Sequence, residues 1–160
     1  MTAADHFLHR GEANPRTRSS VLSVELLEAP PDWDRFLETF ERASRSVARL
    51  RQRVVVPSAP TTSPRWVIDP DFDLSYHVRR VALPGNGSHR ELLDFAEQLF
   101  ITPLDLQRPL WRVTLVEGLE GGGAAMISQL SHAITDGVGG VEMFAQVYDL
   151  TREGRGLAMP

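Results

Sequence analysis

The residues most able to do chemistry are a histidine and an Asp-Gly pair late in the sequence. His132 directly follows an apolar run, Ala124–Ser131, that predicts a buried strand. Asp136 and Gly137 come next, before a helical pattern. An imidazole fixed at a strand end, with a carboxylate held behind it by a tight turn, can take a proton from a hydroxyl or a thiol. His132, with Asp136 behind it, is therefore a candidate general base.

Ser131 precedes the histidine and is the obvious alternative nucleophile. Successive side chains of a strand point to opposite faces, so Ser131 and His132 make a poor nucleophile and base pair. The sequence also contains no Gly-x-Ser-x-Gly elbow of the kind that exposes the serine of α/β-hydrolases. A serine hydrolase is therefore disfavoured.

Metal binding is disfavoured as well. The segment between His132 and Asp136 is predicted to be a turn, and no second histidine lies at the spacing of a metal ligand. The chain has no cysteine, which excludes disulfides, thiolate zinc sites and cysteine nucleophiles. We predict no metal site.

The same residues also have a purely structural interpretation. An Asp-Gly pair before an apolar helical stripe is typical of a helix N-cap and a tight turn. A lone histidine at a strand end is more often a packing residue than a catalytic one. The local pattern alone leaves both interpretations open.

The composition indicates one globular domain. The 160 residues are 42% hydrophobic, which suffices for a core. The net charge is -4, and the 17 basic residues, all arginines, alternate with acids, so nucleic-acid binding is disfavoured.

Residues 1–14 lack the apolar stretch of a secretory signal, and no apolar run approaches the ~20 residues that span a bilayer. We expect a cytoplasmic protein with at most peripheral membrane contact.

The periodicity of apolar residues predicts an α/β sandwich. Helices are expected after Asp32, after a capping box at Ser88 and Glu91, and over an apolar stripe at residues 141–148. The last two strands are apolar on both faces, which is typical of a sheet covered on each side. Strands are predicted at residues 21–27, 52–56, 65–69 and 76–83, followed by a hairpin of Trp111–Glu117 and Ala124–Ser131 around a glycine-rich loop.

Residues 66–137 resemble the N-terminal part of the bacterial wax ester synthase/diacylglycerol acyltransferase family, acyl-CoA-dependent acyltransferases with an HHxxxDG motif. Residues 72–79, Phe-Asp-Leu-Ser-Tyr-His-Val-Arg, are similar to that family's "FDL-YHVR" stretch. Residues 103–111, Pro-Leu-Asp-Leu-Gln-Arg-Pro-Leu-Trp, are similar to its "PLD--RPLW" motif. The family's opening residues are matched by Asp5, Phe7, Leu8 and Glu12.

The resemblance implies a chloramphenicol-acetyltransferase-like two-layer sandwich made of two similar halves. Residues 1–150 would form the N-terminal half, and residues 151–160 would begin the crossover linker to a C-terminal half that this sequence lacks. The motif histidine would lie in a channel between the halves, with acyl-CoA entering from one side and the acceptor from the other.

The resemblance also implies roles for individual residues. His132 corresponds to the second histidine of the motif, which deprotonates the acceptor hydroxyl for direct attack on the thioester. Asp136 corresponds to an aspartate that orients the site, and Gly137 to the turn glycine. Structural roles are implied for Pro109, Leu110 and Trp111.

Two positions depart from the family pattern. Ser131 stands where the family has its first motif histidine, and Arg112 stands at a position that is often acidic. Because neighbouring strand residues face opposite ways, loss of the first histidine leaves the base in place. We expect the change at Ser131 to alter packing or acceptor preference instead.

The resulting hypothesis is an O-acyltransferase that joins a fatty acyl group from acyl-CoA to diacylglycerol or a long-chain alcohol. It needs no cofactor, since acyl-CoA is a substrate. The expected partners are acyl-CoA, a lipid acceptor, the C-terminal half of the same enzyme and the surface of a membrane or lipid droplet. The alternatives are a non-catalytic lipid-binding or scaffolding module of the same fold, and a condensation-type acyltransferase with another acceptor.

The first prediction concerns Asp136, which should cap the helix from Val138 and hold the turn that aims His132. Asp136→Ala should lower the free energy of unfolding by about 1 kcal/mol and reduce acyl transfer with it. Thermal denaturation and turnover measured on the same samples test this. An Asp136→Asn variant that loses activity at an unchanged melting temperature would argue for a direct chemical role.

Overall fold

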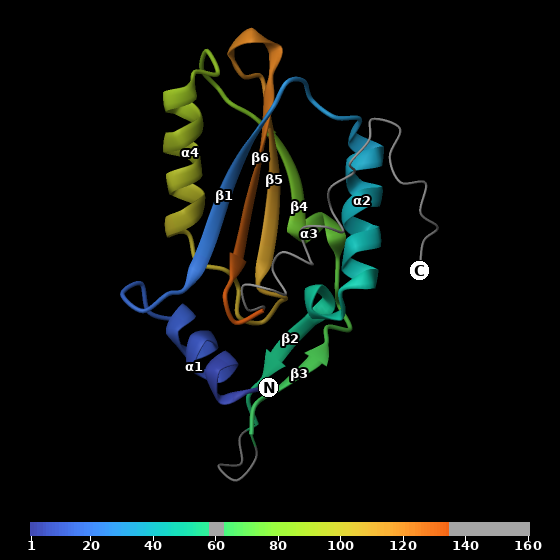
Figure 1. Cartoon of the computed structure of the whole chain (residues 1–160), viewed down its shortest axis with the longest axis vertical. Coiled ribbons are helices and arrows are strands. Elements are labelled where there is room, and N and C mark those ends of the chain that lie inside the picture. Colours follow the sequence, from blue (N-terminus) through green and yellow to red (C-terminus); the bar gives the residue numbers. More distant parts are fainter. Residues whose placement is uncertain (58–62, 135–160) are drawn as a thin grey trace.

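The computed structural model describes residues 1–57 and 63–134, which form a four-stranded sheet, a separate two-stranded sheet and the helices around them (Figure 1). The large sheet has the strand order β1-β6-β5-β4, and the small one pairs β2 with β3. In chain order the elements are α1 (Ala3–Glu12), β1 (Ser20–Leu27), α2 (Trp33–Ser46), the 3-10 helix η1 (Ala48–Arg51), β2 (Gln52–Val55), β3 (Arg65–Ile68), α3 (Leu74–His77), β4 (Val78–Ala82), α4 (His89–Ile101), β5 (Trp111–Glu117), the 3-10 helix η2 (Glu120–Gly122) and β6 (Ala124–Ser131).

Strand β6 lies in the middle of the large sheet. It pairs antiparallel with β1 on one side, where Ser131 lies opposite Ser20, and with β5 on the other, where Leu130 lies opposite Trp111. All eight of its residues are buried. The predicted hairpin is confirmed, and so is the inference that its second strand is covered on both faces. The edge strand β4 pairs parallel to β5.

Two helices cover opposite faces of this sheet (Figure 1). Alternate residues of β6 pack in different directions, with Met126 in the core beneath α2 and Ile127 in the core beneath α4. Core residues on the α2 side include Phe40, Ala43, Trp111, Val113 and Leu130, and those on the α4 side include Leu92, Ala96, Val116 and Ala125.

Both helices begin at the predicted caps. The Asp32 carboxylate accepts a hydrogen bond from the Arg35 N–H at 2.9 Å. Ser88 and Glu91 form a full capping box, in which each side chain accepts from the backbone N–H of the other. These side chains satisfy N–H groups that have no partner inside the helix.

The strand predicted at residues 76–83 begins later than expected. Tyr76 and His77 belong to the short helix α3, and β4 starts at Val78. The Asp73 carboxylate accepts from the N–H of Ser75 at 2.9 Å and from its hydroxyl, which turns the chain before it can extend. The helix expected over residues 141–148 and the linker at 151–160 lie outside the described residues.

Helix α1 was not predicted. It begins with a capping box in which the Thr2 hydroxyl accepts from the Asp5 N–H at 3.1 Å and the Asp5 carboxylate accepts from the Thr2 N–H at 3.0 Å. Its sequence has few apolar residues, so periodicity gives a weak signal. Within the described ranges, no helix is both long enough and apolar enough to cross a membrane.

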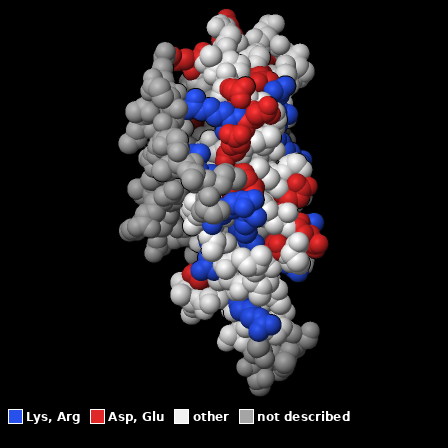
Figure 2. All heavy atoms as spheres, turned by 90° about the vertical axis from the view of Figure 1, so that its right-hand side faces the viewer, with Lys and Arg blue, Asp and Glu red and all other residues white. Residues whose placement is uncertain are grey.

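The face that carries α2 mixes both signs of charge (Figure 2). The Glu41 carboxylate contacts the guanidinium groups of Arg45 and Arg51, each at 2.7 Å. Arg49 lies over the ring of Trp66, 4.4 Å from its centroid. These arginines of α2 and η1 therefore have partners within the fold.

A stack of aromatic rings fills the core beside β5. The imidazole of His77 lies between the rings of Phe72 and Trp111, whose centroids are 5.2 and 4.6 Å away. Its Nδ1 is 2.8 Å from the carbonyl oxygen of Trp111, and because a carbonyl only accepts, Nδ1 carries the proton. His77 is 1% exposed, and burial lowers its pKa below the usual value.

The second prediction follows from this lowered pKa. In the unfolded chain His77 binds a proton below pH about 6.5, whereas the folded protein resists it, so the free energy of unfolding falls as the pH drops below that value. His9, whose pKa is also lowered by burial, adds to the effect. His77→Phe should reduce the dependence by at most about 1.4 kcal/mol per pH unit. Urea denaturation at pH 7.0, 6.0 and 5.5 measures it, and an unchanged slope would contradict it.

Candidate active site

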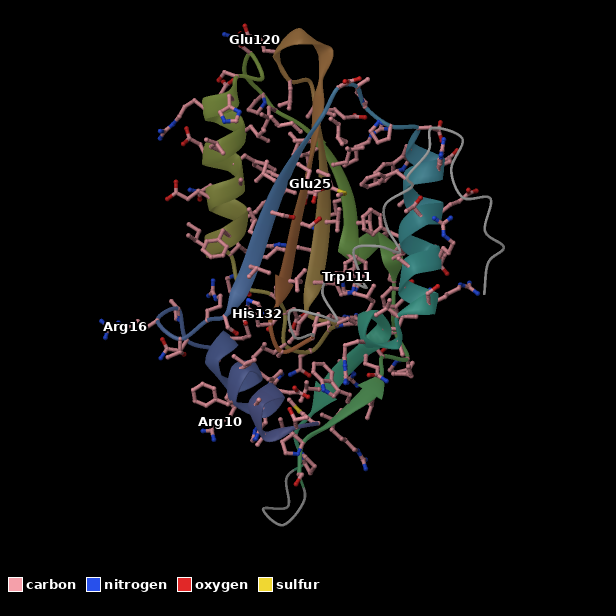
Figure 3. All side chains as sticks on the ribbon, in the orientation of Figure 1. Arg10, Arg16, Glu25, Trp111, Glu120 and His132 are labelled. Atoms are coloured by element: carbon pink, nitrogen blue, oxygen red, sulfur yellow. The ribbon has the colours of Figure 1, made fainter. Side chains whose placement is uncertain are left out.

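His132 lies at one end of the large sheet, opposite the hairpin loop that carries Glu120 (Figure 3). Strand β6 ends at Ser131, and His132 is the first residue of the turn that follows. Its side chain is exposed, and its backbone N–H donates to the carbonyl oxygen of Ser19 at 3.3 Å. The structure therefore presents the imidazole to the surface from a backbone that the neighbouring strand holds.

Ser131 is fully buried, in contrast to the histidine beside it. Its hydroxyl donates to a carboxylate oxygen of Glu12 at 2.8 Å and accepts from the N–H of Ala133 at 3.1 Å. Its backbone N–H donates to the carbonyl oxygen of Leu110 at 3.0 Å. A serine engaged in this way is poorly placed to attack a substrate, as strand alternation predicted.

The Pro-Leu-Trp motif adjoins the same strand end. Leu110 is fully buried and supplies the carbonyl that Ser131 contacts. The Trp111 N–H donates to the Pro109 carbonyl at 2.9 Å, and its indole Nε1 donates to the Leu50 carbonyl at 2.8 Å. The Leu110 contact joins the start of β5 to the end of β6, and the indole contact joins it to η1, so a structural role for the motif agrees with its contacts.

Glu12 is a residue of this region to which the sequence assigned no role. It ends α1, is 2% exposed, and accepts four hydrogen bonds. Besides Ser131, the hydroxyl and the N–H of Ser19 donate to it at 3.1 and 3.2 Å, and the hydroxyl of Ser20 at 2.7 Å. Its match to the family's opening residues was one available signal, and the capping pattern of Thr2 and Asp5, which predicts the start of a helix before Glu12, was another.

Arg112, the second departure from the family pattern, closes the end of α4. Its guanidinium donates to the carbonyls of Leu99 and Thr102 and to the side-chain oxygen of Gln129. Arg18 donates to the two carbonyls between them, those of residues 100 and 101. Cations at this position satisfy carbonyls that lack partners within the helix, and they interact favourably with the negative end of the helix dipole. Arg112 therefore has a structural role at the end of α4.

Described residues line two hollows near β4 and β5. A cavity of about 370 Å³ beside the start of β5 is lined among others by Tyr76, Arg79 and Arg112. A more open depression of about 710 Å³ runs along β4 and is lined among others by Trp33, Tyr76 and Arg80. His132 lines neither of these two hollows, and the channel expected beside the histidine stays a prediction.

The remaining predicted site residues, Asp136 and Gly137, lie outside the described residues. Within residues 1–57 and 63–134, no three histidine, aspartate or glutamate side chains converge as metal ligands do. The structure thus brings together His132, Ser131 and the Pro-Leu-Trp motif, and it adds Glu12 to them.

Comparison with known proteins gives a consistent result. The sequence model described as the wax ester synthase/diacylglycerol acyltransferase catalytic domain matches residues 1–159. A putative diacylglycerol O-acyltransferase of Mycobacterium tuberculosis (strain ATCC 25618 / H37Rv) is 62% identical over 149 residues, which are 93% of this chain and 30% of that protein. The chain therefore spans about a third of the curated relative that it matches.

Solved structures share the fold. The wax ester synthase/diacylglycerol acyltransferase from Marinobacter aquaeolei VT8 superimposes with a TM-score of 0.67 at 29% identity, covering 89% of this chain and 36% of that one. A starter condensation domain of the rhizomide synthetase RzmA, a mutant solved in complex with C8-CoA, gives a TM-score of 0.73 at 14% identity, covering 92% and 33%. The second likeness concerns the fold alone.

The third prediction is that Ser131 forms no acyl-enzyme. Because its hydroxyl is buried and bonded to Glu12, mass spectrometry after incubation with acyl-CoA should find no adduct on the peptide that contains it. Ser131→Ala should keep at least about a hundredth of wild-type turnover, because at most the aim of a neighbouring group changes, whereas loss of a true nucleophile costs up to about 10⁶-fold. A trapped adduct would establish covalent catalysis.

Proposed function

This chain belongs to the wax ester synthase/diacylglycerol acyltransferase family, and on that premise we propose that it supplies the general base, His132, of an enzyme that moves a fatty acyl group from acyl-CoA to diacylglycerol or a long-chain alcohol. Family membership confirms the resemblance drawn from the motifs. The observation that carries the proposal is the exposed imidazole of His132, at the catalytic position of the motif, on a backbone held from both sides.

The reaction requires one proton to move out and back. The imidazole of His132 accepts the proton of the acceptor hydroxyl as its oxygen attacks the thioester carbonyl. The new C–O bond forms, the C–S bond breaks, and the imidazolium returns the proton to the departing thiolate of CoA. Direct attack needs no second nucleophile, which agrees with the buried and bonded hydroxyl of Ser131.

The other parts of the site would come from outside this sequence. The chain spans 30% of its mycobacterial relative, and His132 is exposed. We therefore assign the remaining walls of the acyl-CoA and acceptor channel to the C-terminal half of the enzyme. A lipid acceptor also implies contact with the surface of a membrane or a lipid droplet.

Two rival functions are less well supported. A non-catalytic lipid-binding module would need neither an exposed imidazole nor a held backbone at the motif position. A condensation-type enzyme with another acceptor shares the fold, but those structures are only 13–20% identical to this chain, against 62% for the mycobacterial relative. The acceptor assay below separates them.

The fourth prediction concerns His132→Ala in the full-length enzyme. Loss of the general base should lower turnover with diacylglycerol or hexadecanol by about 10²- to 10⁴-fold, while the melting temperature stays close to wild type because the side chain is exposed. CoA release and lipid product are measured together.

His89→Ala is the matched control, since His89 is also exposed but begins α4, an element that does not contain the motif. It should retain full turnover. Wild-type turnover in His132→Ala would show that the general base is another group. If the wild-type enzyme releases no CoA with either acceptor, a rival function would be favoured.

A further inference from the structure

The carboxylate of Glu12 is buried without a guanidinium partner in the part of the chain that the structure describes. Its hydrogen bonds come from three serine hydroxyls and one backbone N–H. His9, one turn earlier on α1, is buried as well, and burial lowers its pKa, so near neutral pH it is mostly uncharged. A buried carboxylate is costly unless such donors surround it, so this is a built polar cluster.

The donors belong to two strand ends that meet at the site. Ser19 and Ser20 lead into β1, Ser131 ends β6, and Ser20 and Ser131 are partners in the register of the sheet. Helix α1 therefore reaches both strands through one side chain. The two shortest bonds, 2.7 Å to Ser20 and 2.8 Å to Ser131, have the usual lengths of well-formed O–H···O hydrogen bonds.

These bonds reach His132 from two directions. Ser131 is its direct neighbour in the chain, and its hydroxyl is bonded to Glu12. Ser19 is bonded to Glu12 through both its hydroxyl and its N–H, and its carbonyl accepts the N–H of His132. One carboxylate thus restrains the backbone of His132 on both sides.

We infer that Glu12 is a positioning residue for His132, which it holds through Ser131 on one side and Ser19 on the other. The inference rests on the proposed function, because it concerns the aim of the same base. It also explains how a serine serves at the position of the first motif histidine, since a short hydroxyl at Ser131 reaches the carboxylate directly. A displacement of about 1 Å in a catalytic group can cost about a hundredfold in rate.

The fifth prediction tests this with Glu12→Gln in the full-length enzyme. The amide keeps the size of the side chain but replaces an accepting oxygen with a donor, so at least one serine hydroxyl loses its acceptor. We expect kcat to fall by at least about tenfold while KM for acyl-CoA stays within about threefold. The variant changes the position of the His132 imidazole but not the binding of acyl-CoA. The imidazole NMR signals of His132, assigned by their absence in His132→Ala, should shift.

Two controls separate positioning from stability and from charge. Ser88→Ala breaks the capping box of α4 and should lower the free energy of unfolding by about 1 kcal/mol without changing kcat. Glu120→Gln removes an exposed carboxylate at the opposite end of the sheet (Figure 3) and should match wild type. If Glu12→Gln does not fold, Glu12→Asp, which keeps the charge but withdraws it by one methylene, should show the same loss of kcat.

The outcomes are distinct. Wild-type kcat in both Glu12 variants, or an equal loss of kcat in Ser88→Ala at equal stability, would overturn the positioning role. Unmoved imidazole signals in Glu12→Gln would overturn it too. Retained turnover in His132→Ala would instead remove the proposed function, whatever the Glu12 variants do.

Discussion

The pairing of β6 with β1 on one side and β5 on the other is the constraint on which the candidate site depends. The register places Ser131 opposite Ser20 and Leu130 opposite Trp111. Because side chains alternate, a slip of one residue would turn every side chain of β6 to the other face of the sheet and move Ser131 away from Ser20. Two hydrogen bonds resist such a slip where the strand ends, one from Ser131 to the Leu110 carbonyl and one from His132 to the Ser19 carbonyl. The Pro-Leu-Trp motif and the first strand therefore act on the histidine through backbone geometry.

Local patterns predicted much of this arrangement. The hairpin of β5 and β6, the cap at Asp32 and the capping box at Ser88 were each readable because they depend on residues close in sequence. The α3 turn was missed because alternation at residues 76–83 hid the effect of Asp73. The pairing of β1 with β6 and the parallel pairing of β4 with β5 join distant segments, and no local pattern encodes them. The same holds for Glu12, whose partners lie on two strands.

The two departures from the family pattern have local explanations of different kinds. Arg112 donates to carbonyl groups at the end of α4, so a cation at this position stabilises the fold. Ser131 is buried, and its small hydroxyl donates to the buried carboxylate of Glu12 beside the candidate site. A substitution within a motif is thus understood from what the side chain touches and not from its distance to the reacting group.

The bond between Glu12 and Ser131 joins residues 119 positions apart, which bears on how the protein is made. During synthesis the N-terminal helix leaves the ribosome long before the serine that it must meet. Until β6 pairs with β1, the carboxylate has donors only from Ser19 and Ser20 and lacks the hydroxyl of Ser131, so its burial is less well compensated. Closing so long a loop is also a slow step in folding. The end of the sheet that carries His132 is consequently completed only when β6 joins it, and until then Ser19 does not hold the backbone of His132.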